Sequence, residues 1–242
     1  MTRPHQIGVA FSEHRGLVQR HDAREREMDV RTGFAFVTGA QPITWHRVRE
    51  HTEALEIYPD DALVREVADL GLDAAPVRPT LGIDDPVVFG LASLLRRAHL
   101  GRDPLSDVRA SEIGVRLVEH LVGRYSDLRL PFERFKGRLD AGRLRRVGEL
   151  VADRLGGPVT IPAMAAAAGL SAAHFSRAFK RSTGLSPQAY VNARRMTAAK
   201  NLLMTSPMTV DDVAAAVGLA NRSHFRRLFR ATFGVAPSAL RN

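Results

Sequence analysis

The sequence predicts a mainly α-helical chain of two domains. A small α+β domain with a short antiparallel sheet and a helix pair is expected at residues 1–135, and an all-α domain at residues 136–242. Three observations predict this division. Residues 160–242 contain one helical pattern twice, with a long helix between the copies. Residues 136–242 have a net charge of +12 and residues 1–135 one of −3, which together give the +9 of the chain. Segments of β-prone residues occur mainly before residue 59.

The composition excludes several kinds of site. The 242 residues contain no cysteine, so structural disulfides, thiolate metal sites and thiol catalysis are excluded. The segment Met1–His5 has no apolar signal region, and no apolar run approaches the ~20 residues that span a membrane. We therefore expect a cytoplasmic protein without a membrane partner. The basic second half indicates a nucleic-acid-binding module, because a general arginine bias would make both halves basic.

The first residues predict a small antiparallel sheet of three to five strands, since 58 residues are few for a closed barrel. The β-prone segments are Ile7–Phe11, Leu17–Gln19, Gly33–Val37, Ile43–Val48 and Ala54–Tyr58. The charge run Arg20–Arg31 between them is interpreted as a helix or a mobile loop. Four aromatic residues either line a small pocket or pack as ordinary core, namely Phe34, Phe36, Trp45 and Tyr58.

Helical spacing of apolar residues predicts three helices before residue 128. Asp60–Leu70 starts with an N-cap aspartate. Asp85–Leu100 and Ser106–Tyr125 are joined by a short loop, so they should pack as an antiparallel pair. This pair is either ordinary core or a self-association surface. The inward residues expected in the three helices are Leu63, Val67 and Leu70; Val88, Leu91, Leu94 or Leu95, and Ala98; and Val108, Ile113, Leu117, Leu121 and Val122.

The link Leu128–Arg138 contains Pro131 and Gly137, and the charge changes sign across it, so a domain boundary is expected near residue 135. The next segment, Leu139–Leu155, predicts a helix with apolar residues inward and arginines around its rim. Its inward residues are Leu144, Val147, Val151 and Leu155, and its rim arginines are Arg143, Arg145, Arg146 and Arg154.

Each copy of the repeat predicts two helices joined by a tight turn. Thr160 and Ser171 are expected N-caps in the first copy, as Thr209 and Asn221 are in the second. A glycine between the helices supplies the left-handed turn residue. Phenylalanines four apart on each second helix must face the core, so the basic residues there face outward. A short helix of small residues, a glycine turn and a basic second helix are typical of a helix-turn-helix unit.

The helix predicted at Pro187–Met204 joins the two units. Its ~18 residues span roughly 27 Å, and successive major-groove faces of B-DNA lie ~34 Å apart. A rigid helix of this length is suited to hold two recognition helices, at about 171–183 and 221–233, in adjacent major-groove segments of one duplex.

Residues of about 142–242 resemble the DNA-binding domain of the AraC/XylS family of transcription regulators. The second copy carries the resemblance most closely, with Gly218-Leu-Ala-Asn-Arg-Ser-His224-Phe225-Arg-Arg227-Leu-Phe229-Arg230 and Phe233-Gly234-Val-Ala-Pro237. The first copy follows it with His174-Phe175-Ser-Arg177-Ala-Phe179-Lys180. The resemblance implies a sequence-specific transcription regulator that binds double-stranded DNA. It also implies an N-terminal domain for an effector or for homodimer formation, and RNA polymerase as a partner if the protein activates transcription.

The resemblance also implies which residues contact DNA. Base contacts are expected from early exposed positions of each second helix, and phosphate contacts from Lys180 and Arg230. His174 and His224 either contact DNA or bond within their own unit. The expected base-contacting residues are Ala173, Ser176 and Arg177 in the first copy and Arg222, Ser223, His224 and Arg227 in the second.

Two alternatives belong to other functional classes. One is a metal-binding, enzyme-like N-terminal domain using His5, His14, His21, His46 and His51. Their irregular spacing favours scattered surface histidines, and no nucleophile-elbow, P-loop or dinucleotide-binding motif is present. We therefore expect no enzyme, no metal and no cofactor. The other alternative is a ligand-independent dimeric DNA-binding protein whose N-terminal half serves only to dimerise.

Overall fold

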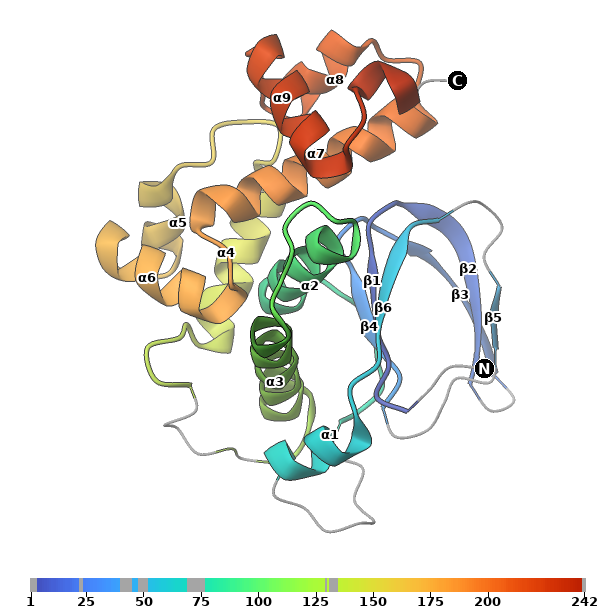
Figure 1. Cartoon of the computed structure of the whole chain (residues 1–242), viewed down its shortest axis with the longest axis vertical. Coiled ribbons are helices and arrows are strands. Elements are labelled where there is room, and N and C mark those ends of the chain that lie inside the picture. Colours follow the sequence, from blue (N-terminus) through green and yellow to red (C-terminus); the bar gives the residue numbers. More distant parts are fainter. Residues whose placement is uncertain are drawn as a thin grey trace. The chain divides into compact units, whose positions relative to one another are not determined.

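The computed structural model describes residues 4–21, 24–39, 45–47, 52–68, 77–128, 130 and 135–240 (Figure 1). They form two compact units. One comprises Met1–Ala92 with Leu105–Lys136, and the other Ser93–Pro104 with Gly137–Asn242. The domain boundary expected between residues 135 and 136 remains a prediction, because the segment Ser93–Pro104 groups with the second unit.

The described strands of the first unit form two antiparallel sheets, a four-stranded one in the order β6-β1-β4-β7 and a three-stranded one in the order β3-β2-β5. Ala10, Leu17 and Val30 come from both sheets and form one buried cluster, so the sheets pack face to face (Figure 1). The strands are β1 Ile7–Ala10, β2 His14–His21, β3 Arg24–Val30, β4 Ala35–Val37, β5 Trp45–Arg47, β6 Ala54–Ile57 and β7 Thr80–Ile83.

The sequence predicts one sheet of three to five strands, whereas the described strands form two sheets, of four and three strands. The interpretation of Arg20–Arg31 as a helix or loop is wrong, because β3 occupies Arg24–Val30 and pairs with β2. Its exposed acidic residues alternate with the partly buried Met28 and the buried Val30, a period of two that fits a strand. Strand β7 was not predicted.

The four aromatic residues considered as a pocket do not act together. Phe34 and Phe36 line a small apolar hollow with Leu17 and Met28. Tyr58 is 46% exposed and donates a hydrogen bond to Glu56. The side chain of Trp45 is outside the described set.

Three helices follow in this half of the chain: α1 Asp61–Ala68, α2 Pro86–His99 and α3 Asp107–Tyr125. The first unit includes α1, α3 and the start of α2 up to Ala92. The predicted N-cap Asp60 is confirmed, since its Oδ1 accepts a hydrogen bond from the Ala62 backbone N–H at 2.8 Å. Ser106 caps α3, with its Oγ accepting a hydrogen bond from the Arg109 backbone N–H at 3.3 Å. Two predicted faces are corrected. In α1 Val67 is buried as predicted, together with Val64 and Ala68, while Leu63 is half-buried and Leu70 lies outside the described residues. In α3 Val108 is 71% exposed, because the first turn lies outside the buried stripe that begins at Ile113.

Asp85 joins the start of α2 to the end of α3, as an antiparallel pair requires. Its Oδ1 accepts hydrogen bonds from the backbone N–H groups of Val87 and Val88 at 2.8 and 3.2 Å. Its Oδ2 accepts one from Tyr125 Oη at 2.6 Å and lies 2.7 Å from His120 Nε2. Burial alone raises the pKa of Asp85, but the attraction of His120 and these hydrogen bonds outweigh burial and hold its pKa well below the usual range. Burial and the charge of Asp85 raise the pKa of Tyr125.

The second unit contains the helices that the repeat predicts. Figure 1 shows α5 and α6 toward one end of α7, and α8 and α9 toward the other. A short 3₁₀ helix, η2, follows α9. The elements are α4 Ala141–Asp153, α5 Ile161–Ala167, α6 Ala172–Thr183, α7 Pro187–Thr205, α8 Val210–Ala216, α9 Arg222–Phe233 and η2 Pro237–Leu240. The mainly α fold class is confirmed.

Helix α7 contributes to the cores of both repeat units. Near its start, the buried Tyr190 packs edge-on against Phe179 of α6, with ring centroids 5.3 Å apart. In its second half, Met196, Ala199 and Leu203 belong to one buried cluster with the phenylalanines of α9. A helix buried along both ends fixes each helix-turn-helix unit to the same rod.

Arginine side chains donate hydrogen bonds to backbone carbonyls between and at the ends of the helices. Arg195 of α7 is 7% exposed and donates hydrogen bonds to the carbonyls of Leu155 and Gly157, which lie between α4 and α5. Burial lowers the pKa of Arg195. Two of the predicted rim arginines, Arg143 and Arg146, have a specific task, since they donate to the carbonyls of Ala168 and Ala167 at the end of α5. No described helix is long and apolar enough to cross a membrane.

Asp85→Asn should lower the free energy of unfolding of the first unit by about 1–3 kcal/mol at pH 7, because an amide cannot replace the carboxylate toward both His120 and Tyr125. The folded state depresses the pKa of Asp85, so its contribution is complete above about pH 4 and disappears as the pH falls further. The difference between variant and wild type should therefore shrink in acid. Urea unfolding followed by the fluorescence of Trp45, the single tryptophan of the sequence, measures it.

The control is Asp127→Asn, which breaks an exposed ion pair of the same unit, with Arg78 at 2.8 Å. It should change the free energy of unfolding by less than about 1 kcal/mol. Equal effects of the two variants at pH 7 would contradict a buried clamp at Asp85.

Arg195→Ala should lower the free energy of unfolding of the second unit by about 2–3 kcal/mol, since two carbonyls lose their charged donor. Urea unfolding followed by circular dichroism measures the loss. Arg145→Ala is the control, because the Arg145 side chain is 63% exposed and pairs only at the surface with Glu149. A loss at Arg195 no greater than that at Arg145 would count against the anchoring role.

Candidate nucleic-acid interface

The sequence positions the two second helices by matching turns. In the first helix-turn-helix unit Thr160 caps α5, and Gly169 has a φ of 64°. Ser171 Oγ then accepts a hydrogen bond from the His174 backbone N–H. A residue with a side chain is strained at such a φ, so the turn requires glycine.

The second helix-turn-helix unit repeats this arrangement. Thr209 and Asp212 form a reciprocal capping box at the start of α8, and Gly218 has a φ of 74°. Asn221 Oδ1 then accepts from the His224 backbone N–H at 2.9 Å, which starts α9. The two turns therefore aim α6 and α9 in the same way relative to their first helices.

The phenylalanine pairs set which face of each second helix is exposed. Phe175 and Phe179 of α6 and Phe225 and Phe229 of α9 are each 0% exposed. Their burial turns the opposite face of each helix to solvent. Of the predicted contact residues, seven are exposed and two, Ser176 and His224, are half-buried. The exposed ones are Ala173, Arg177, Lys180, Arg222, Ser223, Arg227 and Arg230.

The predicted contact residues differ in their own bonds. Ser176 Oγ donates to the Ala172 carbonyl at 2.8 Å, so its hydroxyl proton is used within α6. Arg227 Nη2 lies 3.2 Å from His224 Nδ1. A guanidinium can only donate, so in this contact the His224 ring nitrogen is the acceptor. His224 thus holds Arg227, while its equivalent His174 is exposed.

One charged residue of this surface, Asp211, was not predicted from the sequence. Asp211 of α8 pairs with Arg222 at 3.0 Å and lies 3.7 Å from Arg226. The outward position of Arg226 follows from the helical spacing, but its proximity to Asp211 depends on how α8 and α9 cross. No sequence signal identifies that pair.

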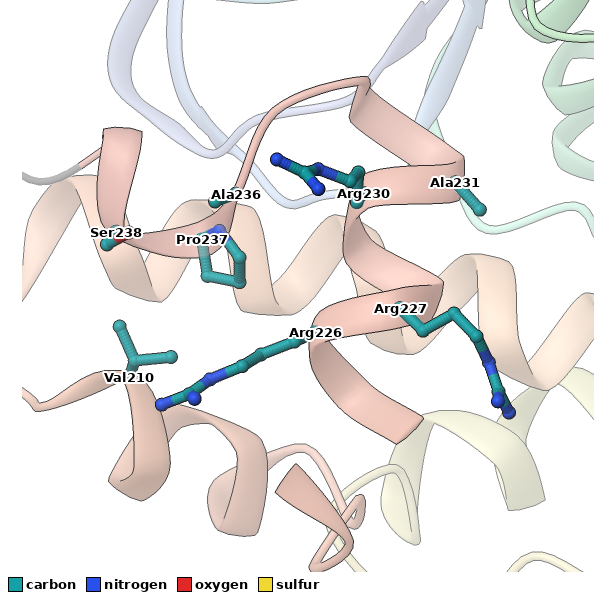
Figure 2. Close-up of a pocket in the computed structure, with 8 residues that line it drawn as sticks. All are labelled: Val210, Arg226, Arg227, Arg230, Ala231, Ala236, Pro237 and Ser238. Atoms are coloured by element: carbon teal, nitrogen blue, oxygen red, sulfur yellow. The ribbon is translucent and has the colours of Figure 1, made fainter. Parts of the chain in front are cut away.

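Beside α9 the surface is hollowed, with a volume of about 790 Å³. Figure 2 shows Arg226 extending toward Val210, Arg230 pointing to the same side of α9 toward Ala236, and Arg227 pointing to the other side. Pro237 and Ser238 of η2 form the opposite wall (Figure 2). The arginines that line this open hollow make a basic surface suited to a polyanion. Among the described residues, no group of three or more His, Asp or Glu side chains is placed to hold a metal ion.

Comparison with known proteins identifies this part of the chain. A family model described as a helix-turn-helix domain matches residues 164–242. The HTH-type transcriptional regulator MtrA of Neisseria gonorrhoeae is 36% identical over 100 residues, which are 40% of this chain and 33% of MtrA. The HTH-type transcriptional activator RhaS of Escherichia coli strain SE11 is 35% identical over 101 residues, 42% of this chain and 36% of RhaS. The matched segment thus spans about a third of the length of these relatives.

A solved structure is also similar. It is that of a probable AraC family transcriptional regulator from Rhodopseudomonas palustris CGA009, 35% identical, with coverage of 41% of this chain and 94% of that one and a TM-score of 0.39. The family model identifies residues 164–242 as a helix-turn-helix domain, and the motifs of both copies resemble those of the AraC/XylS family.

Proposed function

We propose that the chain is a sequence-specific transcription regulator that inserts α6 and α9 into adjacent major-groove segments of double-stranded DNA. One observation carries the proposal: two helix-turn-helix units share α7, and each exposes a basic face on its second helix. The names of the relatives, a transcriptional regulator and a transcriptional activator, support the same function.

The roles of the contact residues follow from their chemistry. Arg177 and Arg227 occupy equivalent positions and can bind guanine O6 and N7 through two hydrogen bonds. Ala173 can contact a thymine methyl group, and the other early residues of α9 read neighbouring bases. Lys180 and Arg230 lie one turn later, where phosphate contacts fix the register of the helix on the duplex.

The first unit is proposed as the regulatory part. It either binds a small-molecule effector or forms a homodimer through the α2–α3 pair, and the protein contacts RNA polymerase if it activates transcription. A thermal-shift screen against small metabolites tests the effector, and light scattering at micromolar concentration tests the dimer. A monomeric mass would contradict the dimer.

DNA binding itself is tested by selecting duplexes from a random pool with the full chain. Two enriched half-sites about one helical turn apart are expected, because a single chain presents two recognition helices. Recovery of no preferred sequence would overturn the proposal.

Arg227→Ala should weaken binding to the selected duplex by about 1–3 kcal/mol and relax the preference at one base position. Fluorescence anisotropy with single-base variants of the duplex measures both effects. Arg145→Ala, on α4, is the matched control and should leave the preferences unchanged. If Arg227→Ala also leaves them unchanged, Arg227 does not read a base.

Lys180→Ala should weaken binding to every duplex by the same factor, because phosphates are present in all sequences. The slope of log affinity against log salt concentration should fall by about 1, as one fewer phosphate contact releases about one fewer counterion. A change in base preference with an unaltered salt slope would instead assign Lys180 to a base edge.

A further inference from the structure

Asp211 is placed between two arginines of the recognition helix α9. It is the second residue of α8 and lies 3.0 Å from a guanidinium nitrogen of Arg222 and 3.7 Å from one of Arg226. Arg222 and Arg226 are four residues apart, so both side chains leave α9 on the side of Asp211. One carboxylate therefore faces two cations that border the proposed DNA-reading surface.

Of the two helix-turn-helix units, only the second carries this set of charges. In the aligned repeat, Asp211 corresponds to Pro162, Arg222 to Ala172 and Arg226 to Ser176. The first helix-turn-helix unit thus lacks all three charges and still forms the corresponding two helices, α5 and α6. The charges are not needed to build a helix-turn-helix unit.

The surroundings of Asp211 do not indicate a role in stability. The carboxylate side chain is 34% exposed and the two arginine side chains 69% and 61% exposed, and ion pairs at such sites stabilise proteins little. Asp211 Oδ1 is buried without a hydrogen-bond partner in the described structure, which is unfavourable. The N-terminus of α8 is already capped by Thr209 and Asp212.

We propose that Asp211 determines how strongly α9 discriminates between DNA sequences, by positioning Arg222 and restraining Arg226. This inference rests on the proposed function. An unpaired arginine binds the phosphates of any duplex equally well, which raises affinity without selectivity. Arg226 must leave its ion pair with Asp211 before it can bind a phosphate. Arg222 is held by the same carboxylate in a position from which its guanidinium can contact a base edge. The carboxylate also repels phosphates that approach in the wrong register.

The test uses the full chain and two probes, the duplex selected from a random pool and a scrambled duplex of the same composition. Asp211→Asn should raise the affinity for the scrambled duplex by about threefold to tenfold and that for the selected duplex less, so their ratio falls. A repeated selection with Asp211→Asn should give a weaker preference at the base that Arg222 reads. Asp211→Glu keeps the charge and should restore part of the ratio.

Glu149→Gln is the matched control. It also removes one negative charge that pairs with an arginine, Arg145 at 3.0 Å, but on α4. It should shift both affinities by one common factor. Asp211→Asn in a chain that already carries Arg222→Gln and Arg226→Gln should likewise leave the ratio unchanged, and melting curves check that each variant is folded.

The outcomes separate the two proposals. If selection with the wild type gives no preferred sequence, the proposed function fails and this inference fails with it. If a preferred sequence exists but Asp211→Asn changes both affinities by the same factor as Glu149→Gln, only the role of Asp211 is overturned.

Discussion

The packing of α7 into two cores is the constraint on which the second unit depends. Tyr190 belongs to the core of the first helix-turn-helix unit, and Met196, Ala199 and Leu203 belong to that of the second. The intervening turns of one continuous helix then relate the two units. Arg195 adds the α4–α5 connection to the same helix through two backbone carbonyls. The orientation of α6 relative to α9 therefore depends on buried side chains and not on a flexible link.

The two units share a scaffold and differ in their exposed chemistry. Both use a capped first helix, a left-handed glycine and a pair of buried phenylalanines. On the exposed face, α6 begins with Ala172 and Ala173 before its basic residues, whereas α9 begins with Arg222. Two arginines of α9 pair with Asp211 and one with His224. Local signals in the sequence specify the scaffold, while the exposed positions are free to differ.

Much of the C-terminal compact unit could be predicted, because the sequence features that specify its helices and turns are local. N-caps such as Ser171 and Asn221, the turn glycines and the four-residue phenylalanine spacing each act within one or two helical turns. The repeat then supplied each signal twice. The contact between Asp211 and Arg222 could not be predicted, because it depends on the crossing of two helices and not on spacing along one.

The first unit was less predictable for the same reason. Strand β3 is rich in charges, and only its pairing with β2 and the inward Val30 make it a strand. Val108 fits a helical apolar stripe yet is exposed, because nothing in the described structure covers the first turn of α3. The link between Asp85, His120 and Tyr125 joins residues 35 and 40 positions apart. Long-range contacts of this kind decide sheet pairing and helix faces.

The shared helix has a consequence for shortened chains. Removal of α8 and α9 would expose Met196 and Leu203, and removal of α5 and α6 would expose Tyr190. Each half of the repeat therefore covers apolar residues of the shared helix, and loss of one half leaves part of α7 without its cover. A truncated chain with one reader is therefore not a smaller version of this domain.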